Sequence, residues 1–479
     1  MSAVWENFVG ADHYGGQLMH PGVVDDLRKA LATNGQVGVD GSMLIPQSLE
    51  TTLKITTHKM KELKLWQRIA KRPAYAITEE YNALLDYGLD ENGFITEGAL
   101  PNEDSSTYKR EVGVVKFMGT VRAVTHPMTL VRTTIGSAID QEDANGTMHL
   151  LRLLEIALFY GDDRLNPQSF RGFKQIIEQR APENIIDLGG KPITPAVMEE
   201  VDLRIADKFG EIDTLYMSTR AKANMSKAFQ DSGLQRLHLP VERTETNLGM
   251  VPQQYQGNNS QFTIENHKFI REQVRPKTSI PQALATRVAA RPVAPTVAPV
   301  VAAGDFSRMK AGTYVYTVGA VNDIGEGLES PVSQEVTLDA GDAVAVTITQ
   351  VPGARYYRIY RNRAGESTSK RMLLTEVADS NAATTVYTDR GVYIPGCSTA
   401  FGLYTDPDQG FCFKQLAPLM KLPLAQINTS MRWAILLYGM LQVYQPRKNI
   451  MLINVGDEGM SASSQFEPDT ELADYFRGL

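Results

Sequence analysis

The chain has 479 residues, of which 43% are hydrophobic and 22% are charged, as in an average soluble folded protein. These values exclude a wholly disordered chain, a collagen and a coiled-coil rod, and the length allows roughly two to four domains. With 48 basic and 55 acidic side chains the net charge is −7, so a protein that coats nucleic acid by charge is disfavoured.

The two cysteines, Cys397 and Cys412, exclude a disulfide scaffold and a four-cysteine zinc site. They lack the Cys-X-X-Cys spacing of redox and metal motifs, so we expect both to be buried as small hydrophobic side chains. No apolar run approaches the ~20 residues that span a bilayer, and no secretory signal is visible at the start of the chain. We therefore expect a protein that folds in a reducing compartment and has no membrane partner.

Residues 1–65 are thinly patterned and rich in glycine. The spacing of their apolar side chains predicts a short helix over residues 23–31 and a longer one over residues 49–69. Two interpretations of the segment stay open. It is either a flexible N-terminus or an extended arm that becomes ordered against a neighbouring subunit.

Residues 87–101 are rich in turn signals, and residues 111–124 then alternate in the way of one long strand. Apolar side chains lie on both faces of this strand, with Val112 on one face and Phe117 on the other. A two-stranded hairpin is marginally stable by itself, so one that lacks a single apolar face needs a partner surface. We predict that residues 88–122 lie over an adjacent subunit and make few contacts with their own core.

Residues 133–160 predict one long helix, with Gly146 as the place for a bend. Thr194 and Pro195 are typical of a helix cap and a first helical residue, so a second helix is predicted to start there. A buried strand over residues 214–218 and a further helix follow. This alternation of strands and helices favours a mixed α/β core.

Prolines among alanines and valines in residues 281–304 predict an extended linker and not a helix. Beyond it, short alternating stretches separated by Gly, Asp and Asn turns predict an antiparallel β-sandwich. The sandwich is an insertion, because a hydrophobic strand over residues 450–455 and a polar tail come later. We predict that residues 290–396 are self-contained and project from an outer surface. Their flanking segments, residues 262–271 and 401–413, are expected to pair with each other.

The sequence shows no motif for catalysis or cofactor binding. It lacks a Walker phosphate loop, a Gly-X-Gly-X-X-Gly segment after a strand and a Gly-X-Ser-X-Gly elbow. Its Gly325-Glu326-Gly327 segment is expected to be a turn of the sandwich. No two of the seven histidines have close metal-ligand spacing; they are His13, His20, His58, His126, His149, His238 and His267. We predict no catalytic, cofactor-binding or metal-binding residue.

One cluster of basic and aromatic residues lies in the insertion and comprises Arg355, Arg358, Arg361 and Arg363 with Tyr356, Tyr357 and Tyr360. Such interleaving is found where proteins bind nucleic acid. Residues 291–396, however, carry 10 basic and 11 acidic side chains, so the insertion is close to neutral. We therefore favour a sandwich strand with a solvated arginine face over a nucleic-acid site.

Four groups of residues carry a resemblance to a known family. They are Phe94-Ile95-Thr96-Glu97-Gly98-Ala99-Leu100-Pro101 with Tyr108-Lys109-Arg110, then Glu155-Ile156-Ala157-Leu158-Phe159-Tyr160-Gly161-Asp162, Thr214-Leu215-Tyr216-Met217-Ser218, and Tyr438-Gly439-Met440-Leu441. In this order they resemble the extended loop, spine helix, axial domain and peripheral domain of the major capsid proteins of tailed bacteriophages. Gly312-Thr313-Tyr314-Val315-Tyr316 and the turn after it resemble an immunoglobulin-like or fibronectin type III module.

The resemblance implies an α+β chain with the HK97-like fold and an inserted all-β sandwich. It divides the chain into an N-terminal arm (1–70), an extended loop with flanking strands (71–132), a spine helix and peripheral domain (133–190), an axial domain (191–289), the inserted sandwich (290–396), the return of the axial domain (397–430), the closing strand of the peripheral domain (431–456) and a polar C-terminal tail (457–479).

The resemblance also implies a structural protein of the virion that is not an enzyme. Copies of the chain would form hexamers and pentamers of an icosahedral head, assembled in the host bacterial cytoplasm. The implied partners are a scaffolding protein, a portal at one vertex, packaged double-stranded DNA held by weak contacts, and a glycan or decoration protein at the insertion. The candidate intersubunit contacts are Phe94, Glu97, Tyr108, Arg110, Lys116 and Arg122. Two alternatives are an encapsulin-type compartment shell and a carbohydrate-active enzyme with a fibronectin-like module.

Overall fold

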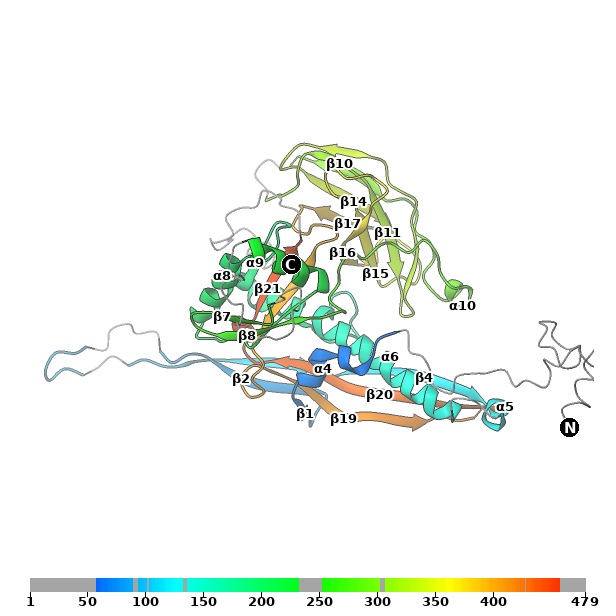
Figure 1. Cartoon of the computed structure of the whole chain (residues 1–479), viewed down its shortest axis with the longest axis horizontal. Coiled ribbons are helices and arrows are strands. Elements are labelled where there is room, and N and C mark those ends of the chain that lie inside the picture. The colour runs from blue at the N-terminus through cyan, green and yellow to red at the C-terminus, as the bar shows by residue number, and fades with distance from the viewer. Residues whose placement is uncertain are drawn as a thin grey trace, which may run out of the picture. The chain divides into compact units, whose positions relative to one another are not determined.

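The structure is a computed structural model that describes residues 57–88, 94–100, 103–131, 136–231, 252–301, 306–426 and 428–456 (Figure 1). Contacts divide the chain into one unit of residues 1–56 and 127–141 and a second unit of residues 57–126 and 142–479. The described part of the first unit holds most of helix α5 (His126–Leu130) and the first residues of α6 (Ala138–Tyr160). The predicted helix over residues 23–31 and the C-terminal tail lie outside the described residues.

Everything else belongs to the second unit. Its remaining helices are η2 (Met60–Glu62), α4 (Lys64–Arg68), α7 (Phe173–Arg180), η3 (Pro182–Asn184), α8 (Pro195–Ala206), α9 (Thr219–Asp231), α10 (Gln282–Ala285) and η5 (Pro446–Lys448). The long helix predicted from the sequence is confirmed, since α6 is continuous through Gly146. The cap of α8 is also confirmed, because the Thr194 hydroxyl accepts a hydrogen bond from the Val197 amide at 3.4 Å.

The helix predicted over residues 49–69 is wrong in its described part. The chain forms only η2 and α4 there, separated at Leu63, whose backbone leaves the helical region at φ −86° and ψ 68°. Leu63 and Leu65 are fully buried. Tertiary packing of these side chains therefore sets the local backbone, and the helical spacing of apolar residues did not show that break.

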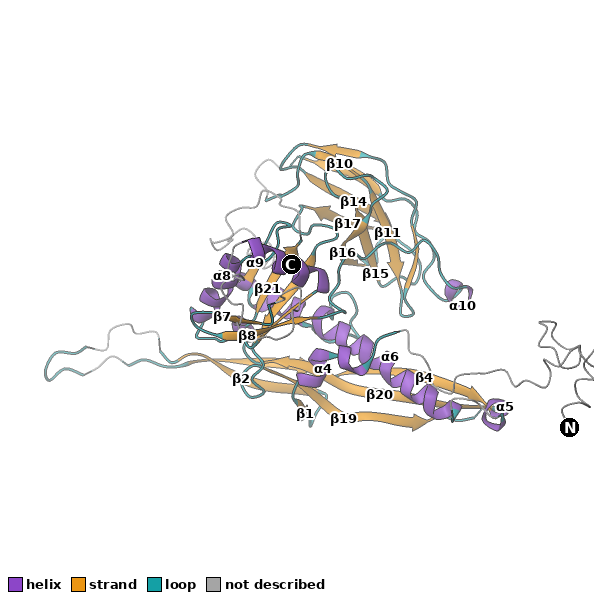
Figure 2. Ribbon diagram, viewed as in Figure 1, coloured by secondary structure: helices purple, strands orange, loops and turns teal. Residues whose placement is uncertain are grey.

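A four-stranded sheet lies along α6 in the order β1, β19, β20, β4, with strands Lys71–Pro73, Phe411–Pro423, Ser430–Val443 and Lys116–Thr125 (Figure 2). The helix and the sheet meet closely at Gly146. A Cβ atom there would lie 2.6 Å from Cδ1 of Ile435 and 3.0 Å from Cγ of Arg122. Glycine at this position therefore permits the close approach of α6 to β20 and β4.

The strand predicted over residues 111–124 is two strands with different partners. Strand β3 (Thr107–Val114) pairs with β2 (Thr78–Asp86) in a hairpin, whereas β4 pairs with β20 along its whole length. The break is at Val115, which is buried and donates its amide to the Ile77 carbonyl. The prediction that residues 88–122 make few contacts with their own core is therefore wrong for residues 116–122.

A six-stranded mixed sheet forms the α/β core in the order β5, β21, β18, β6, β8, β7, with strands Ile185–Asp187, Ile450–Val455, Ser398–Leu403, Thr214–Met217, Gln261–Asn266 and Gln254–Gln256. The buried strand predicted at residues 214–218 is confirmed as β6. The flanks of the insertion were expected to pair with each other, and this prediction is wrong. Strand β6 lies between β8 and β18 and pairs with both. Apolar side chains of α8 and α9 pack with this sheet in one core cluster.

The insertion is a β-sandwich with its own core. Its sheets are β17-β14-β9, β12-β11-β15-β16 and the short pair β10-β13, with strands Thr296–Val300 (β9), Gly312–Tyr314 (β10), Tyr316–Val321 (β11), Glu326–Glu329 (β12), Val336–Leu338 (β13), Ala343–Thr349 (β14), Tyr356–Arg361 (β15), Met372–Ala378 (β16) and Thr384–Asp389 (β17). Side chains from β11, β14 and β15 share one buried cluster.

Two predictions about the start and turns of the sandwich are wrong. Residues 281–304 are not an extended linker, because they contain helix α10 and the pairing strand β9. Pro299 is tolerated since β9 is the edge of its sheet. The Gly325-Glu326-Gly327 segment is not only a turn, because β12 begins at Glu326.

One buried carboxylate connects three parts of the second unit. Glu155 of α6 and His267, which follows β8, are both fully buried, with 2.7 Å between Glu155 Oε1 and His267 Nε2. The same carboxylate accepts the backbone amides of Leu65 at 2.8 Å and Trp66 at 3.0 Å. The side chain of Glu155 thus joins the long helix to α4 and to the end of β8 in the α/β sheet, and its burial is compensated by these partners.

Replacing this carboxylate should strongly destabilise the fold. We expect Glu155→Ala to lower the free energy of unfolding by about 3–5 kcal/mol, because two backbone amides and a histidine lose their partner in the interior. The matched control is Glu142→Ala on the same helix. Glu142 is partly exposed and lies 3.5 Å from Arg122, so its loss should cost less than about 1 kcal/mol. Equal denaturant midpoints for the two variants would contradict this account.

Candidate functional site

The β2–β3 hairpin is the described part of the chain that exposes the most prominent apolar side chains. It is paired from Thr78 with Val114 to Asp86 with Thr107, and Figure 1 shows it extending past the end of the neighbouring sheet. Around its outer end Phe94 is 92% exposed and Leu100 is 91% exposed. Tyr87 and Tyr108 are also largely exposed. Such a concentration of exposed apolar groups marks a surface that contacts another molecule.

The six predicted contact residues fall into two places. Phe94, Glu97, Tyr108 and Arg110 are all exposed on the hairpin. The Arg110 guanidinium lies 3.4 Å from the carboxylate of Glu80 on the facing strand. These four side chains therefore share one projecting element.

The other two predicted residues lie on β4 and have partners within the chain. The Lys116 ammonium donates to the Pro167 carbonyl at 2.6 Å. The Arg122 guanidinium lies 3.5 Å from the Glu142 carboxylate of α6. Both are half-buried, so the structure separates them from the hairpin group.

A groove beside the base of the hairpin was not predicted from the sequence. It is lined by residues of β2, by the end of α7, by the loop after α8 and by residues 444–448. Phe209, in that loop, is 93% exposed and has a positive φ of 55°. Glycine or asparagine is usual at such a position after a helix, and a bulky residue there is strained. An aromatic ring held outward under strain favours a role in contact, and a single sequence gives no signal for it.

The arginine cluster of the insertion is not a solvated face. The Arg358 guanidinium bonds to Glu326 at 2.8 Å and to Glu376 at 2.9 Å. Arg361 is buried and paired with Asp389. The expected solvated face is therefore wrong, because carboxylates distant in sequence neutralise these arginines. The nucleic-acid interpretation gains no support either, since these guanidiniums are engaged within the chain.

The same cluster holds the sandwich against the α/β domain. Glu376 of β16 also accepts from Arg271, which lies outside the sandwich, at 2.8 Å. A second contact joins the Tyr393 hydroxyl to Glu178 of α7 at 2.7 Å. Arg308 is paired in addition with Asp187, which ends β5. The sandwich is thus docked through several charged and polar contacts.

The cysteine and histidine predictions have mixed outcomes. Cys412 is buried as expected, and burial raises the pKa of its thiol, whereas Cys397 is only half-buried. His267 is a buried partner of Glu155, whereas His149 is exposed, and partial desolvation together with the charges of Arg122 and Arg152 lowers its pKa. Within the described ranges, no group of three or more His, Cys, Asp or Glu side chains could hold a metal ion. No described helix is both long and apolar enough to span a membrane.

Acid should loosen the docking of the sandwich. Burial alone would raise the pKa of Glu376, but Arg271 and Arg358 lower it from 4.5 to about 2. A carboxyl group with a lowered pKa stabilises the fold fully above pH 4.5, and this stabilisation is lost as the pH falls toward 2. We expect the thermal unfolding midpoint of Glu376→Gln to change less between pH 4.5 and pH 2 than the midpoint of the unchanged chain. Glu335→Gln, at an exposed position of the sandwich, is the control and should follow the unchanged chain. An unaltered pH profile in Glu376→Gln would contradict this role.

No protein-family model matches the chain. The chain is 25% identical over 463 residues to the major capsid protein of Staphylococcus phage S25-3, which covers 90% of this chain and 94% of the relative. The major capsid protein of Staphylococcus phage K is similar to the same extent. Among solved structures, the capsid of a native GTA particle is 9% identical and covers 89% of this chain and 100% of that chain, with a TM-score of 0.45. The encapsulin complex of Synechococcus elongatus is 10% identical and covers 88% of this chain and 98% of that chain, with a TM-score of 0.40.

The similarity to the phage proteins runs through nearly the whole length of both chains. The hairpin, the long helix, the α/β core and the closing strands also follow one another in the order that the resemblance implied. The chain is therefore similar along nearly its whole length to the phage major capsid proteins, and it is an α+β protein that carries an inserted β-sandwich.

Proposed function

We propose that this chain is the structural subunit of a phage head. Copies of it assemble into hexamers and pentamers of an icosahedral shell that encloses double-stranded DNA, and it catalyses no reaction. The single observation that supports this most is the hairpin, whose outer end exposes Phe94 and Leu100 almost completely. Large apolar side chains on a projecting hairpin are unfavourable in an isolated subunit and are stabilising once a neighbour covers them.

The hairpin contacts the adjacent subunit through Phe94, Glu97, Tyr108 and Arg110. Full burial of a side chain such as Phe94 or Leu100 is worth about 1.5–3 kcal/mol. A closed ring repeats the same contact at every subunit, so modest pair energies add up to a stable assembly. Lys116 and Arg122 support this interface indirectly, because their bonds to Pro167 and Glu142 hold β4 in place next to the hairpin.

The charge of the chain suits a container for DNA. A subunit of net charge −7 has little general affinity for phosphate backbones, so the packaged DNA is held by weak and non-specific contacts. A scaffolding protein and a portal at one vertex are the further partners of assembly, which takes place in the host bacterial cytoplasm. The inserted sandwich lies on the outer surface of the virion, where it contacts a glycan or a decoration protein.

Polar substitution of the hairpin should prevent assembly without unfolding the subunit. We expect the full-length Phe94→Ser/Leu100→Ser variant to sediment as small species, while the unchanged chain forms large particles visible by negative-stain electron microscopy. The physical reason is the loss of two exposed apolar anchors that no contact in the subunit core requires.

The matched control is Val386→Ser, which removes an exposed apolar side chain from the sandwich. This variant should assemble normally, and all three proteins should have similar thermal unfolding midpoints. Normal particles from the double variant would contradict the proposed interface. Particles that take up a protein cargo in place of DNA would favour an encapsulin-type shell, and hydrolysis of glycans by a particle-free chain would favour the enzyme alternative.

A further inference from the structure

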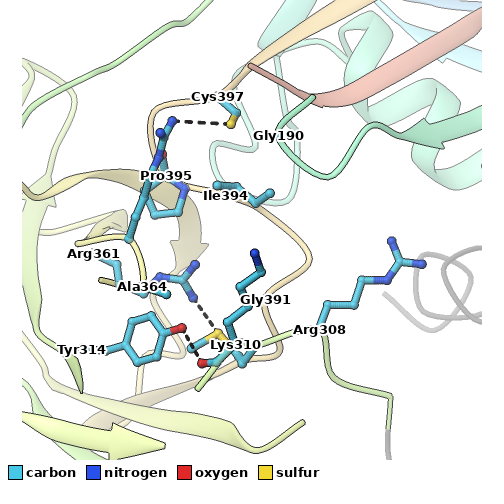
Figure 3. A pocket seen from close by; sticks show the side chains of 12 residues that line it. Gly190, Arg308, Lys310, Tyr314, Arg361, Ala364, Gly391, Ile394, Pro395 and Cys397 are labelled. Atoms are coloured by element: carbon cyan, nitrogen blue, oxygen red, sulfur yellow. Dashed lines mark hydrogen bonds between the residues drawn. The ribbon is translucent and has the colours of Figure 1, made fainter. Parts of the chain in front are cut away.

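A pocket between the sandwich and the α/β domain is lined by four basic side chains, which are Arg308, Lys310, Arg361 and Arg363. The α/β domain contributes Gly190 and Cys397 to the same pocket. Figure 3 shows the side chains of Lys310 and Arg361 within this pocket, whereas Arg308 extends away from them. Nothing in the proposed capsid function requires this concentration of positive charge.

Arg361 has unused hydrogen-bonding capacity in the interior. Its side chain is only 4% exposed, and its guanidinium pairs with Asp389 and donates to the Tyr393 carbonyl at 3.4 Å. Among the described residues, however, its Nε atom has no hydrogen-bond partner. A buried donor that stays unsatisfied costs about 1–3 kcal/mol, so a group that accepts from it would be stabilising.

Lys310 adds an uncompensated charge to the same pocket. Its backbone carbonyl accepts from the Tyr314 hydroxyl at 2.7 Å, but its ammonium has no hydrogen bond or ion pair within the described part of the chain. Asp187 and Asp389 pair with Arg308 and Arg361. Of the described residues that line the pocket, none is a carboxylate. An anion is therefore the kind of ligand that this pocket attracts.

We propose that this pocket is an oxyanion-binding site that takes a phosphate or a carboxylate. The Lys310 ammonium donates to its oxygen atoms, and the guanidiniums of Arg361 and Arg363 at the same wall add positive charge. Guanidinium and ammonium groups together are the usual recognition set for such anions. Since the lining comes from both the sandwich and the α/β domain, a bound anion also braces one against the other.

Two sources could supply this anion. One is free phosphate in solution. The other is the chain itself, because Asp457 and Glu458 directly follow Gly456 in the sequence. A Cβ atom at Gly456 would lie 2.8 Å from the Gly190 carbonyl and 3.1 Å from the sulfur of Cys397, so the described chain ends at the wall of the pocket. A tethered carboxylate would compete with free phosphate at a high effective concentration.

The test is calorimetric titration of inorganic phosphate into the full-length chain at low ionic strength. If the anion comes from solution, the proposal expects binding of one phosphate per chain, weakened by at least about tenfold in Lys310→Ala. Lys370→Ala, at an exposed position of the same sandwich, is the control and should bind as the unchanged chain does. Thermal unfolding of each variant shows that it is folded, and phosphate should raise the midpoint only where it binds.

A further full-length variant, Asp457→Asn/Glu458→Gln, separates the two sources. If phosphate binds this variant and not the unchanged chain, the pocket is an oxyanion site that the chain's own carboxylates occupy. If phosphate binds both equally, the anion comes from solution. The proposal is overturned if neither binds phosphate, or if adding Lys310→Ala to a chain that binds phosphate leaves its affinity unchanged.

Discussion

The fully buried carboxylate of Glu155 is the contact on which the second unit depends. It fixes α6 against α4 through two backbone amides and against the α/β sheet through His267. The same helix contacts the other sheet at Gly146, where the side chains of Ile435 and Arg122 occupy the space that a Cβ atom would need. One helix thus contacts both sheets.

The hairpin differs from the rest of the second unit because it exposes large apolar side chains to solvent. The buried charges of the subunit have partners, as Glu376 has in Arg271 and Arg358. The hairpin instead exposes Phe94 and Leu100, and Phe209 is exposed beside its base under backbone strain. Large apolar side chains that gather on one projecting element suit assembly into a shell, since the free energy of association is then concentrated at those contacts.

The sequence predicted a helix or strand well where residues within one segment determine it. It predicted poorly where a strand or side chain distant in the sequence determines the pairing. The continuous α6, the cap at Thr194 and the buried β6 follow from spacing and capping alone. The period of two over residues 111–124 could not show that β3 and β4 pair with different strands. Likewise, the arginines of β15 looked solvated because Glu326, Glu376 and Asp389 reach them from other strands. The exposed hairpin residues were found through family resemblance, whereas the groove at Phe209 had no sequence signal.

The most direct test of the proposed hairpin contact is an electron cryomicroscopy reconstruction of particles formed by the full-length chain. The account predicts a closed icosahedral shell in which the β2–β3 hairpin of each subunit covers its neighbour, with Phe94 and Leu100 buried at that contact. It also predicts the sandwich on the outer surface, docked on its own subunit through Glu376. A shell in which the hairpins remain exposed to solvent and the subunits meet through other surfaces would contradict the central claim.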